Sequence, residues 1–178
     1  MKFLIASDIH GSAYYTKKII SLMEKEGADK LVLLGDIYNH GPRNPFPEEY
    51  NPGEVATLLN ANKDRLIVVK GNCDSEVDKM ISDFDFVENT VIVSGNKTVF
   101  LTHGHVYNKD AMPKTCFDAV VYGHFHTGFI ERDGKSVVAN AGSVSLPKNG
   151  TPSSYMILED GVLSLYDIEG KLIKKENL

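Results

Sequence analysis

The chain has 178 residues, of which 42% are hydrophobic and 24% charged, and 24 acidic against 19 basic residues give a formal net charge of -5. This length and composition are typical of one globular domain with a substantial core. The lack of any Lys/Arg-rich run argues against a groove for long nucleic acid, although bound metal ions would still attract a small anion. Two cysteines, Cys73 and Cys116, form no disulfide framework, and the apolar run at Phe3–Ala6 is too short for a signal peptide or a membrane span. We therefore expect a cytoplasmic protein without membrane association.

The first half of the chain alternates between apolar runs and helical patterns. Three short apolar runs end in a polar or glycine-containing turn, as expected of strands that are covered on both faces. These runs are Phe3–Ala6, Lys30–Leu34 and Arg65–Val69. Between the first two, Ser12 can cap a helix that stops at Gly27, and a second helix is expected over Pro52–Asn60. This order favours a parallel sheet with right-handed crossovers.

A proline-rich stretch, Asn39–Gly53, separates the second run from the second helix. It contains Pro42, Pro45, Pro47 and Pro52, which disfavour regular structure over these residues. Loops of this length are often functional, and a rigid surface excursion is equally compatible with the pattern.

The second half predicts short strands joined by tight turns. The expected hairpins are Thr90–Val93 with Thr98–Thr102, Gly128–Arg132 with Lys135–Ala139, and Tyr155–Leu158 with Val162–Tyr166. No repeat relates the two halves, and no Ser/Gly linker separates them. We therefore expect a single α/β domain over residues 1–178 with two packed sheets.

Five short polar segments contain five of the six histidines, and each segment follows an apolar run. The segments are Asp8-Ile9-His10-Gly11, Gly35-Asp36, Gly71-Asn72-Cys73-Asp74, Thr102-His103-Gly104-His105 and Gly123-His124-Phe125-His126. Their side chains should gather at the carboxyl edge of the sheet, where open α/β sheets bind ligands. Imidazole and carboxylate together suit manganese, iron, zinc and similar divalent ions.

The spacing inside two segments suggests how the side chains reach one site. Asp8 and His10, like His124 and His126, are separated by one residue, and such residues project to the same side of an extended backbone. Two divalent ions against the carboxylates of Asp8 and Asp36 would leave a positive centre that attracts phosphate and activates water. Each pair alone is weak evidence, because Asp-x-His is commonly a turn beside a surface histidine. The order of all five segments carries the interpretation.

Together the segments resemble the ordered motifs of the calcineurin-like metallophosphoesterases, which are Asp-x-His, Gly-Asp-x4-Gly, Gly-Asn-x-Asp, His and Gly-His-x-His. The resemblance runs from Asp8 to His126, and Asn140-Ala141-Gly142-Ser143 resembles a further family turn. It implies a four-layer αββα sandwich of two mixed β-sheets flanked by helices. It also implies two divalent metal ions, usually manganese, with zinc, iron or nickel as alternatives.

The same resemblance assigns seven ligands to two metals. The ligands are Asp8, His10 and His126 for the first metal, Asn72, His103 and His124 for the second, and Asp36 as the bridge. The implied reaction is in-line attack on phosphorus by a metal-bridging hydroxide, without a protein nucleophile. The expected substrate is a small phosphodiester.

One position departs from the family pattern. Many members carry a histidine directly after Asn72 that protonates the leaving group, whereas this chain has Cys73. A thiol, with an ordinary pKa of about 8.5, is a different proton donor. Asp74 could orient whichever acid acts, and His105 could be that acid or only a hydrogen-bonding neighbour of the ligands. These four residues are the candidate catalytic residues, and the departure predicts diesters with good leaving groups rather than alkyl monoesters.

Two residues of the proline-rich stretch, His40 and Arg43, are candidates for gripping the substrate phosphate, because arginine suits bidentate phosphate contacts. If the chain forms a homo-oligomer, Tyr14, Phe46 and Tyr50 are candidates for its interface.

Other functions stay open. They are a non-catalytic protein-binding scaffold like the retromer subunit of this fold, a broader phosphomonoesterase or nucleotidase, and a nuclease or cyclic-nucleotide phosphodiesterase. Retention of all seven ligand positions favours an enzyme over a scaffold. The lack of a basic groove disfavours a nuclease that acts on long nucleic acid.

Overall fold

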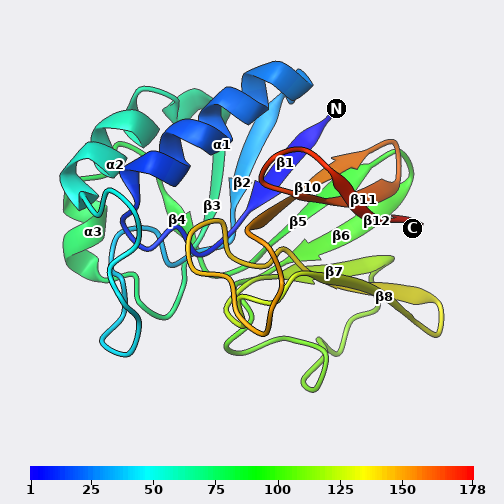
Figure 1. Ribbon diagram of the computed structural model, residues 1–178. Coiled ribbons are helices and arrows are strands. Elements are labelled where there is room, and N and C mark those ends of the chain that lie inside the picture. Colours follow the sequence, from blue (N-terminus) through cyan, green and yellow to red (C-terminus); the bar gives the residue numbers. More distant parts are fainter.

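The computed structural model describes residues 1–178 and consists of two β-sheets with helices on one side (Figure 1). The larger sheet is formed by β1 (Phe3–Ala6), β2 (Lys30–Leu33), β3 (Leu66–Val69), β4 (Phe86–Val87), β10 (Ser154–Glu159), β11 (Val162–Asp167) and β12 (Leu172–Asn177). The smaller sheet is formed by β5 (Thr90–Ser94), β6 (Lys97–Leu101), β7 (Ala119–Tyr122), β8 (Phe129–Asp133) and β9 (Ser136–Asn140). Their strand orders are β12-β11-β10-β1-β2-β3-β4 and β5-β6-β7-β9-β8.

The helices begin where capping chemistry permits. In α1 (Ala13–Glu26), the Ser12 hydroxyl accepts the Tyr15 N–H at 3.2 Å, and Gly27 ends the helix in the left-handed conformation with φ 63°. The next helix, α2 (Pro52–Asn60), has its first-turn N–H capped by the side chain of Asn51. A third, one-turn helix is α3 (Glu76–Met80), and a 3-10 turn spans Lys63–Arg65. Both predicted helices are confirmed, and no helix is long and apolar enough to cross a membrane.

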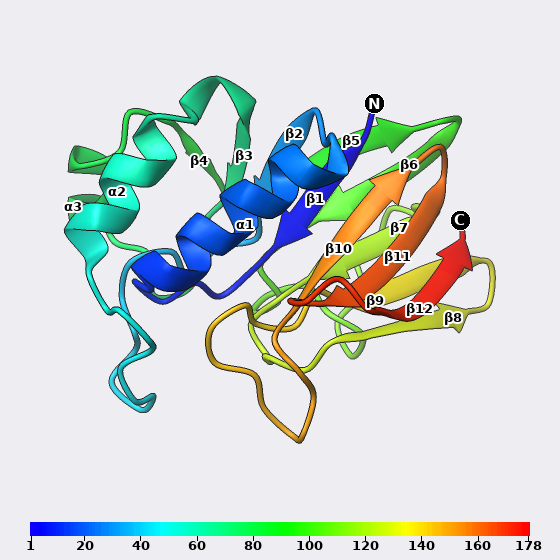
Figure 2. The same cartoon turned by 45° about the horizontal axis from the view of Figure 1, so that its top comes forward.

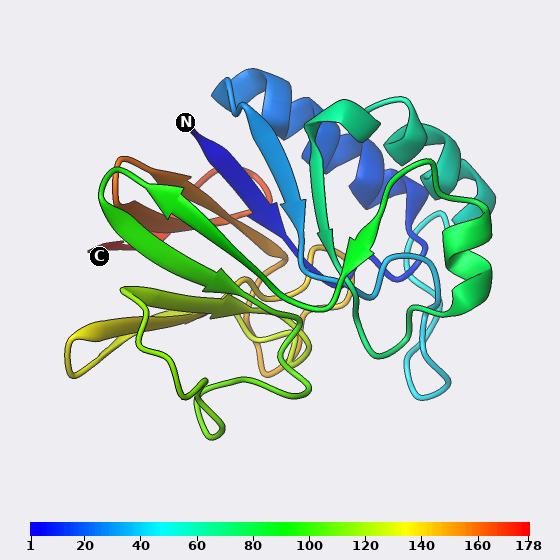
Figure 3. The same cartoon turned by 180° about the vertical axis from the view of Figure 1, so that it is seen from behind.

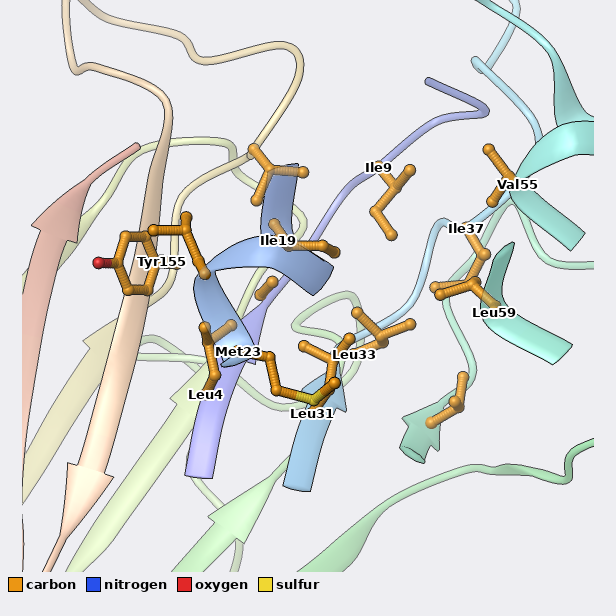
Figure 4. Packing of buried hydrophobic residues seen from close by; sticks show 14 of the residues in the cluster. Leu4, Ile9, Ile19, Met23, Leu31, Leu33, Ile37, Val55, Leu59 and Tyr155 are labelled. Carbon is orange, nitrogen blue, oxygen red and sulfur yellow. The ribbon is translucent and has the colours of Figure 1, made fainter. Parts of the chain in front are cut away.

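Apolar residues alternate between two cores along the central strands. Leu4 and Leu33 face the helices and pack with Met23 of α1 (Figure 4). Their neighbours Ile5 and Val32 face the smaller sheet instead. Because both faces are covered, these strands read as continuous apolar runs. Each fully buried aliphatic side chain contributes about 1.5–3 kcal/mol.

The directions of the strands place the carboxyl ends of strands from both sheets at the same edge of the molecule. Strands β1 to β4 pair in parallel, and β6 and β9 both pair in parallel with β7, whereas the three predicted hairpins are antiparallel. The predicted parallel first half and strand-rich second half are confirmed. Figure 3 shows the arrowheads of β1 and β2 pointing to the same region as that of β6. The polar segments that follow these strands therefore start close together.

The expected sandwich of two mixed sheets is confirmed, but its outer layer on the smaller sheet is a loop rather than a helix. All three α-helices precede β5, and the segment between β6 and β7 covers the outer face of the smaller sheet. The ring of Phe117 stacks on that of Phe100, with centroids 5.0 Å apart, and Tyr107 and Met112 pack on the same cluster. Large side chains of an irregular segment thus cover this face.

Candidate metal centre

The five polar segments meet at the shared edge of the two sheets. Asp8, Asp36 and Asn72 follow β1, β2 and β3 of the larger sheet, and His103 and His124 follow β6 and β7 of the smaller one. The predicted gathering at the carboxyl ends of the strands is confirmed.

One cluster joins Asp8, His10 and His126. The Asp8 Oδ1 atom lies 3.3 Å from His126 Nε2 and 3.6 Å from His10 Nε2, and the two Nε2 atoms are 3.2 Å apart. All three residues are buried. They are the residues that the family resemblance assigns to the first metal.

A second cluster joins Asn72, His103 and His124. The His103 Nε2 atom lies 2.9 Å from Asn72 Oδ1 and 3.2 Å from His124 Nδ1. Asp36 lies between the clusters, with Oδ1 3.4 Å from His103 Nε2 and Oδ2 3.8 Å from His10 Nε2. Its two oxygens therefore face different clusters, which is the arrangement that a bridging carboxylate needs.

Backbone carbonyls orient three of these imidazoles. Each Nδ1 lies 2.6 to 2.7 Å from a carbonyl oxygen, in the pairs His10 with Asn39, His103 with Leu34 and His126 with Leu146. Because a carbonyl only accepts, each Nδ1 carries a proton and donates it. In the neutral imidazole, the Nε2 atom that faces the cluster is then a bare acceptor.

The first cluster therefore brings unshared electron pairs together without a donor between them. The Nε2 atoms of His10 and His126 face each other, and Asp8 Oδ1 is buried without a hydrogen-bond partner. An unsatisfied buried acceptor costs about 1–3 kcal/mol. A cation among these three atoms would remove both conflicts, and imidazole with carboxylate is a donor set that divalent first-row metals take. These residues fit a metal ion.

Protons compete for the same position. Burial alone would lower the pKa of His10, but the adjacent Asp8 carboxylate raises it above the ordinary value. Burial likewise opposes the charge on Asp8, while the imidazoles of His10 and His126 hold the pKa of this carboxyl well below its usual range. The cluster thus favours a positive charge at its centre.

Asp8 is held by hydrogen bonds on its other sides. Its Oδ2 accepts from the Ser7 hydroxyl at 2.6 Å and from the His124 N–H at 2.9 Å. Its backbone carbonyl accepts from the hydroxyls of Ser143 and Ser145, at 2.8 and 2.9 Å. Only Oδ1 remains to face the cluster. The sequence signalled the turn that ends at Ser143, but not the role of these hydroxyls.

The backbone of the ligand segments is not extended, so the expected i, i+2 geometry was wrong. Asp8, His10, Asp36, His124 and His126 have φ values of 55°, 52°, 54°, 65° and 58°, in the left-handed region. Non-glycine residues rarely adopt it, at a cost of roughly 1 kcal/mol or more each. The pairs still reach the centre, because the turn after each strand curls both side chains inward. Such strain concentrated in one place is typical of a functional site.

The buried carboxylate of Asp74 binds backbone N–H groups and forms no hydrogen bond to a candidate proton donor. Its carboxylate accepts the N–H groups of Gly71, Asp36 and Ile37 at 2.7, 2.9 and 2.8 Å, and burial raises its pKa to about 6. These bonds tie the loop after β3 to the loop after β2. The geometry is that of a positioning residue and not of one that orients an acid.

The two candidate acids differ in their placement. Cys73 faces the open side of the site, and burial with the nearby Asp36 and Asp74 carboxylates raises the pKa of its thiol to about 12. His105 is exposed, with its ring centroid 5.4 Å from that of His103 and its pKa lowered by partial burial. His105 does not line the cavity above the clusters.

A cavity of about 680 Å³ opens above the clusters, a size that suits a small-molecule substrate. Five of the seven predicted ligands line it, while Asp8 and His103 lie in the floor below. Arg43 also lines the cavity. Asn44, from the same proline-rich stretch, lines it too, as does Lys148, which no motif in the sequence marked.

His40, the other predicted substrate-binding residue, does not line the cavity. Its ring packs against Phe46 and Tyr50, with centroids 4.5 and 5.4 Å away. Of the side chains suggested for an interface, Phe46 is 67% exposed, whereas Tyr14 and Tyr50 are partly buried.

Known proteins are similar to this chain in sequence and in fold. Residues 1–160 match the model of the calcineurin-like phosphoesterase superfamily domain. Phosphodiesterase YfcE of Escherichia coli is 43% identical over 175 residues, which cover 97% of this chain and 95% of that protein. The solved structure of the E. coli phosphoesterase YfcE aligns with a TM-score of 0.95 at 41% identity, covering 99% of both chains.

A more distant likeness concerns the fold alone. Zinc-bound Vps29 of Entamoeba histolytica aligns with a TM-score of 0.63 at 20% identity, over 100% of this chain and 98% of that one. The family model and the closely similar relative confirm the resemblance drawn from the motifs. The chain belongs to the calcineurin-like phosphoesterase superfamily.

Proposed function

We propose that this metallophosphoesterase hydrolyses small phosphodiesters at a dinuclear metal centre. The observation that carries the proposal is the pair of adjacent clusters that share Asp36 and direct bare acceptor atoms inward. The relative that is 43% identical is itself named a phosphodiesterase, which supports the diester as the substrate class.

The ligand assignment follows the two clusters. We assign Asp8, His10 and His126 to one ion, Asn72, His103 and His124 to the other, and Asp36 to both. The unpartnered Asp8 Oδ1 and the facing Nε2 atoms support the first set. Manganese suits imidazole and carboxylate ligands, as do zinc, iron and nickel. Because the ligands come from both sheets, we also propose that residues 1–178 act as one domain.

The bound ions would lower the pKa of water and stabilise charge on the phosphoryl oxygens. The protein's own residues position the reactants. Carbonyls keep the imidazoles of His10, His103 and His126 in one tautomer, and Arg43 offers donors at the cavity wall to an anionic group of the substrate. In-line displacement by water at such a centre needs no protein nucleophile.

Proton donation to the leaving group is the weak part of this site. A thiol, with an ordinary pKa of about 8.5, gives up a proton less readily than an imidazolium, and His105 does not line the cavity. An aryl oxide leaves without a proton, whereas an alkoxide needs one. We therefore propose a preference for diesters with good leaving groups over alkyl monoesters.

The test is a substrate panel on metal-stripped protein that is reconstituted separately with manganese, nickel, zinc and magnesium. We expect hydrolysis of bis(para-nitrophenyl) phosphate to return with a transition metal, and Asp36→Asn to remove it. Asp133→Asn, the same substitution at the exposed last residue of β8, serves as the matched control. Faster hydrolysis of ethyl phosphate would favour a broader monoesterase. If no metal restored hydrolysis of any substrate, the proposed phosphodiesterase activity would be contradicted and a protein-binding scaffold would be favoured.

A further inference from the structure

Two cationic side chains on the cavity wall have no carboxylate partner. Arg43 and Lys148 both line the cavity, whereas the other two arginines of the chain are paired with glutamates. Asp36 is the only carboxylate among the lining residues. In a chain with a net charge of -5, two unpaired cations at one cavity indicate an anionic ligand.

The loop that carries Arg43 is tied to the first cluster. The Asn39 carbonyl accepts His10 Nδ1 at 2.7 Å, and Asn39 Oδ1 accepts the Gly41 N–H at 2.8 Å. The Asn44 N–H donates to the Gly41 carbonyl at 3.2 Å. These bonds hold the turn around Arg43 against the imidazole of a predicted ligand.

The loop that carries Lys148 is tied to the same cluster from the other side. The Leu146 carbonyl accepts His126 Nδ1 at 2.6 Å, and the Lys148 N–H donates to the His126 carbonyl at 2.9 Å. Both the N–H and the hydroxyl of Thr151 donate to the Lys148 carbonyl. Figure 2 shows this loop (orange) and the Arg43 loop (cyan) projecting from the same end of the molecule.

The two cations therefore flank the side of the cavity formed by His10 and His126. Two divalent ions, the carboxylates of Asp8 and Asp36 and a bridging hydroxide would leave one positive charge, which the single negative charge of a diester already balances. The two cations add positive charge beyond that balance. The cavity also has no Phe, Tyr or Trp on which a nucleobase could stack. Both facts favour a small substrate with a second anionic group.

We propose that Arg43 and Lys148 form a second anion subsite beside the first cluster. It takes a carboxylate or phosphate on the alcohol that remains attached to the substrate's phosphorus. The subsite deepens the proposed phosphodiesterase function and rests on it. Arginine supplies a planar fork of donors and lysine a mobile point charge, so together they suit an oxyanion of either kind.

The experiment compares kcat/KM for three para-nitrophenyl phosphodiesters, with the metal-loaded protein. Their second alcohol ends in a carboxamide, a carboxylate or a phosphate, so the leaving group is the same and the carboxamide is the neutral match of the carboxylate. We expect an anionic ester to exceed the carboxamide by about three- to ten-fold in kcat/KM. Two ratios are compared, that of the carboxylate ester to the carboxamide ester and that of the phosphate ester to the carboxamide ester. The larger of them identifies the preferred anionic group. Added salt should reduce the ratio.

Variants assign the preference to the two cations. Lys148→Gln and Arg43→Gln should each lower the ratio toward one, and Lys148→Arg should retain it. Lys135→Gln is the matched control, because Lys135 is exposed and precedes β9 at the edge opposite the site. Equal kcat/KM for all three esters in the wild type, or an unchanged ratio in both glutamine variants, would overturn the subsite alone. Failure to hydrolyse any of the esters would instead overturn the proposed function.

Discussion

The Nε2 atoms of His10 and His126 lie 3.2 Å apart, and the other nitrogen of each ring is bound to a backbone carbonyl. This arrangement leaves two unshared pairs facing each other beside the unpartnered Asp8 Oδ1. The fold holds these atoms together through two loops and a strained backbone, so it maintains a site that a cation relieves.

Metal binding should therefore stabilise the folded chain. At a metal concentration of one hundred times Kd, the free energy of unfolding should increase by about 2.7 kcal/mol. This increase corresponds to a rise in Tm of roughly 5–10 °C for a chain of this size. Asp8→Asn should remove most of the rise, because it weakens the charge that the ion meets. Differential scanning fluorimetry of metal-stripped protein, with and without manganese, measures both. An equal rise in Asp8→Asn and in the control Asp133→Asn would exclude Asp8 as a ligand.

The two serines that bind the Asp8 carbonyl should differ in importance. The Ser145 hydroxyl donates only to this carbonyl, so Ser145→Ala should cost about 1 kcal/mol of unfolding free energy. The Ser143 hydroxyl also accepts the N–H groups of Ser145 and Leu146, at 3.2 and 2.8 Å. Ser143→Ala leaves both donors unsatisfied, and we expect a cost of about 2–3 kcal/mol. Urea unfolding checks the order, and equal costs would contradict this account.

The ligand segments could be predicted from the sequence because their Asp, Asn and His residues directly follow apolar runs that predict strands. Each follows an apolar run, and the carboxyl ends of parallel strands must meet at one edge. Their left-handed backbone could not be predicted, since Asp and His adopt it more often than other non-glycine residues but still only in a small minority of cases. The hydrogen bonds to the Asp8 carbonyl come from serines more than a hundred residues away in the chain.

Two other features of the structure, the position of Lys148 and the cover of the smaller sheet, have no hydrophobic periodicity in the sequence that would predict them. Lys148 lies in a loop with no motif, and its place at the cavity follows from the bond between its backbone and that of His126. The cover of the smaller sheet depends on Tyr107, Met112 and Phe117, which have neither helical nor strand spacing. Tertiary packing decided these features.

Asp118 predicts a pH dependence of stability away from the site. It accepts the N–H and hydroxyl of Thr98, each at 2.9 Å, and the Lys97 ammonium, and these contacts hold its pKa below the usual value. A depressed folded-state pKa contributes stability above the unfolded pKa and loses it as pH falls through the folded pKa. Asp118→Asn should thus lower Tm at neutral pH by about 2–4 °C.

The difference in Tm between wild type and Asp118→Asn should shrink as the pH falls below about 4, where the carboxylate protonates in both states. Thermal melts across pH, with Asp133→Asn as the control, measure it. A difference that stays constant from neutral to acid pH would show that the charge of Asp118 is not the cause.

Cys73 offers a direct test of how the leaving group is protonated. Cys73→His puts an imidazole, with an ordinary pKa of about 6.5, in place of a thiol with an ordinary pKa of about 8.5. General acid catalysis contributes about 10²- to 10⁴-fold where a leaving group needs a proton, so esters with alkoxide leaving groups should gain tenfold or more in kcat/KM. Aryl diesters should gain much less, because their leaving groups depart unprotonated. Cys73→Ser, which keeps the size but supplies no better acid, should show no such selective gain. If both substrate classes gained equally in Cys73→His, the cause would be binding and not proton donation, and the proposed weakness of this site as an acid would be wrong.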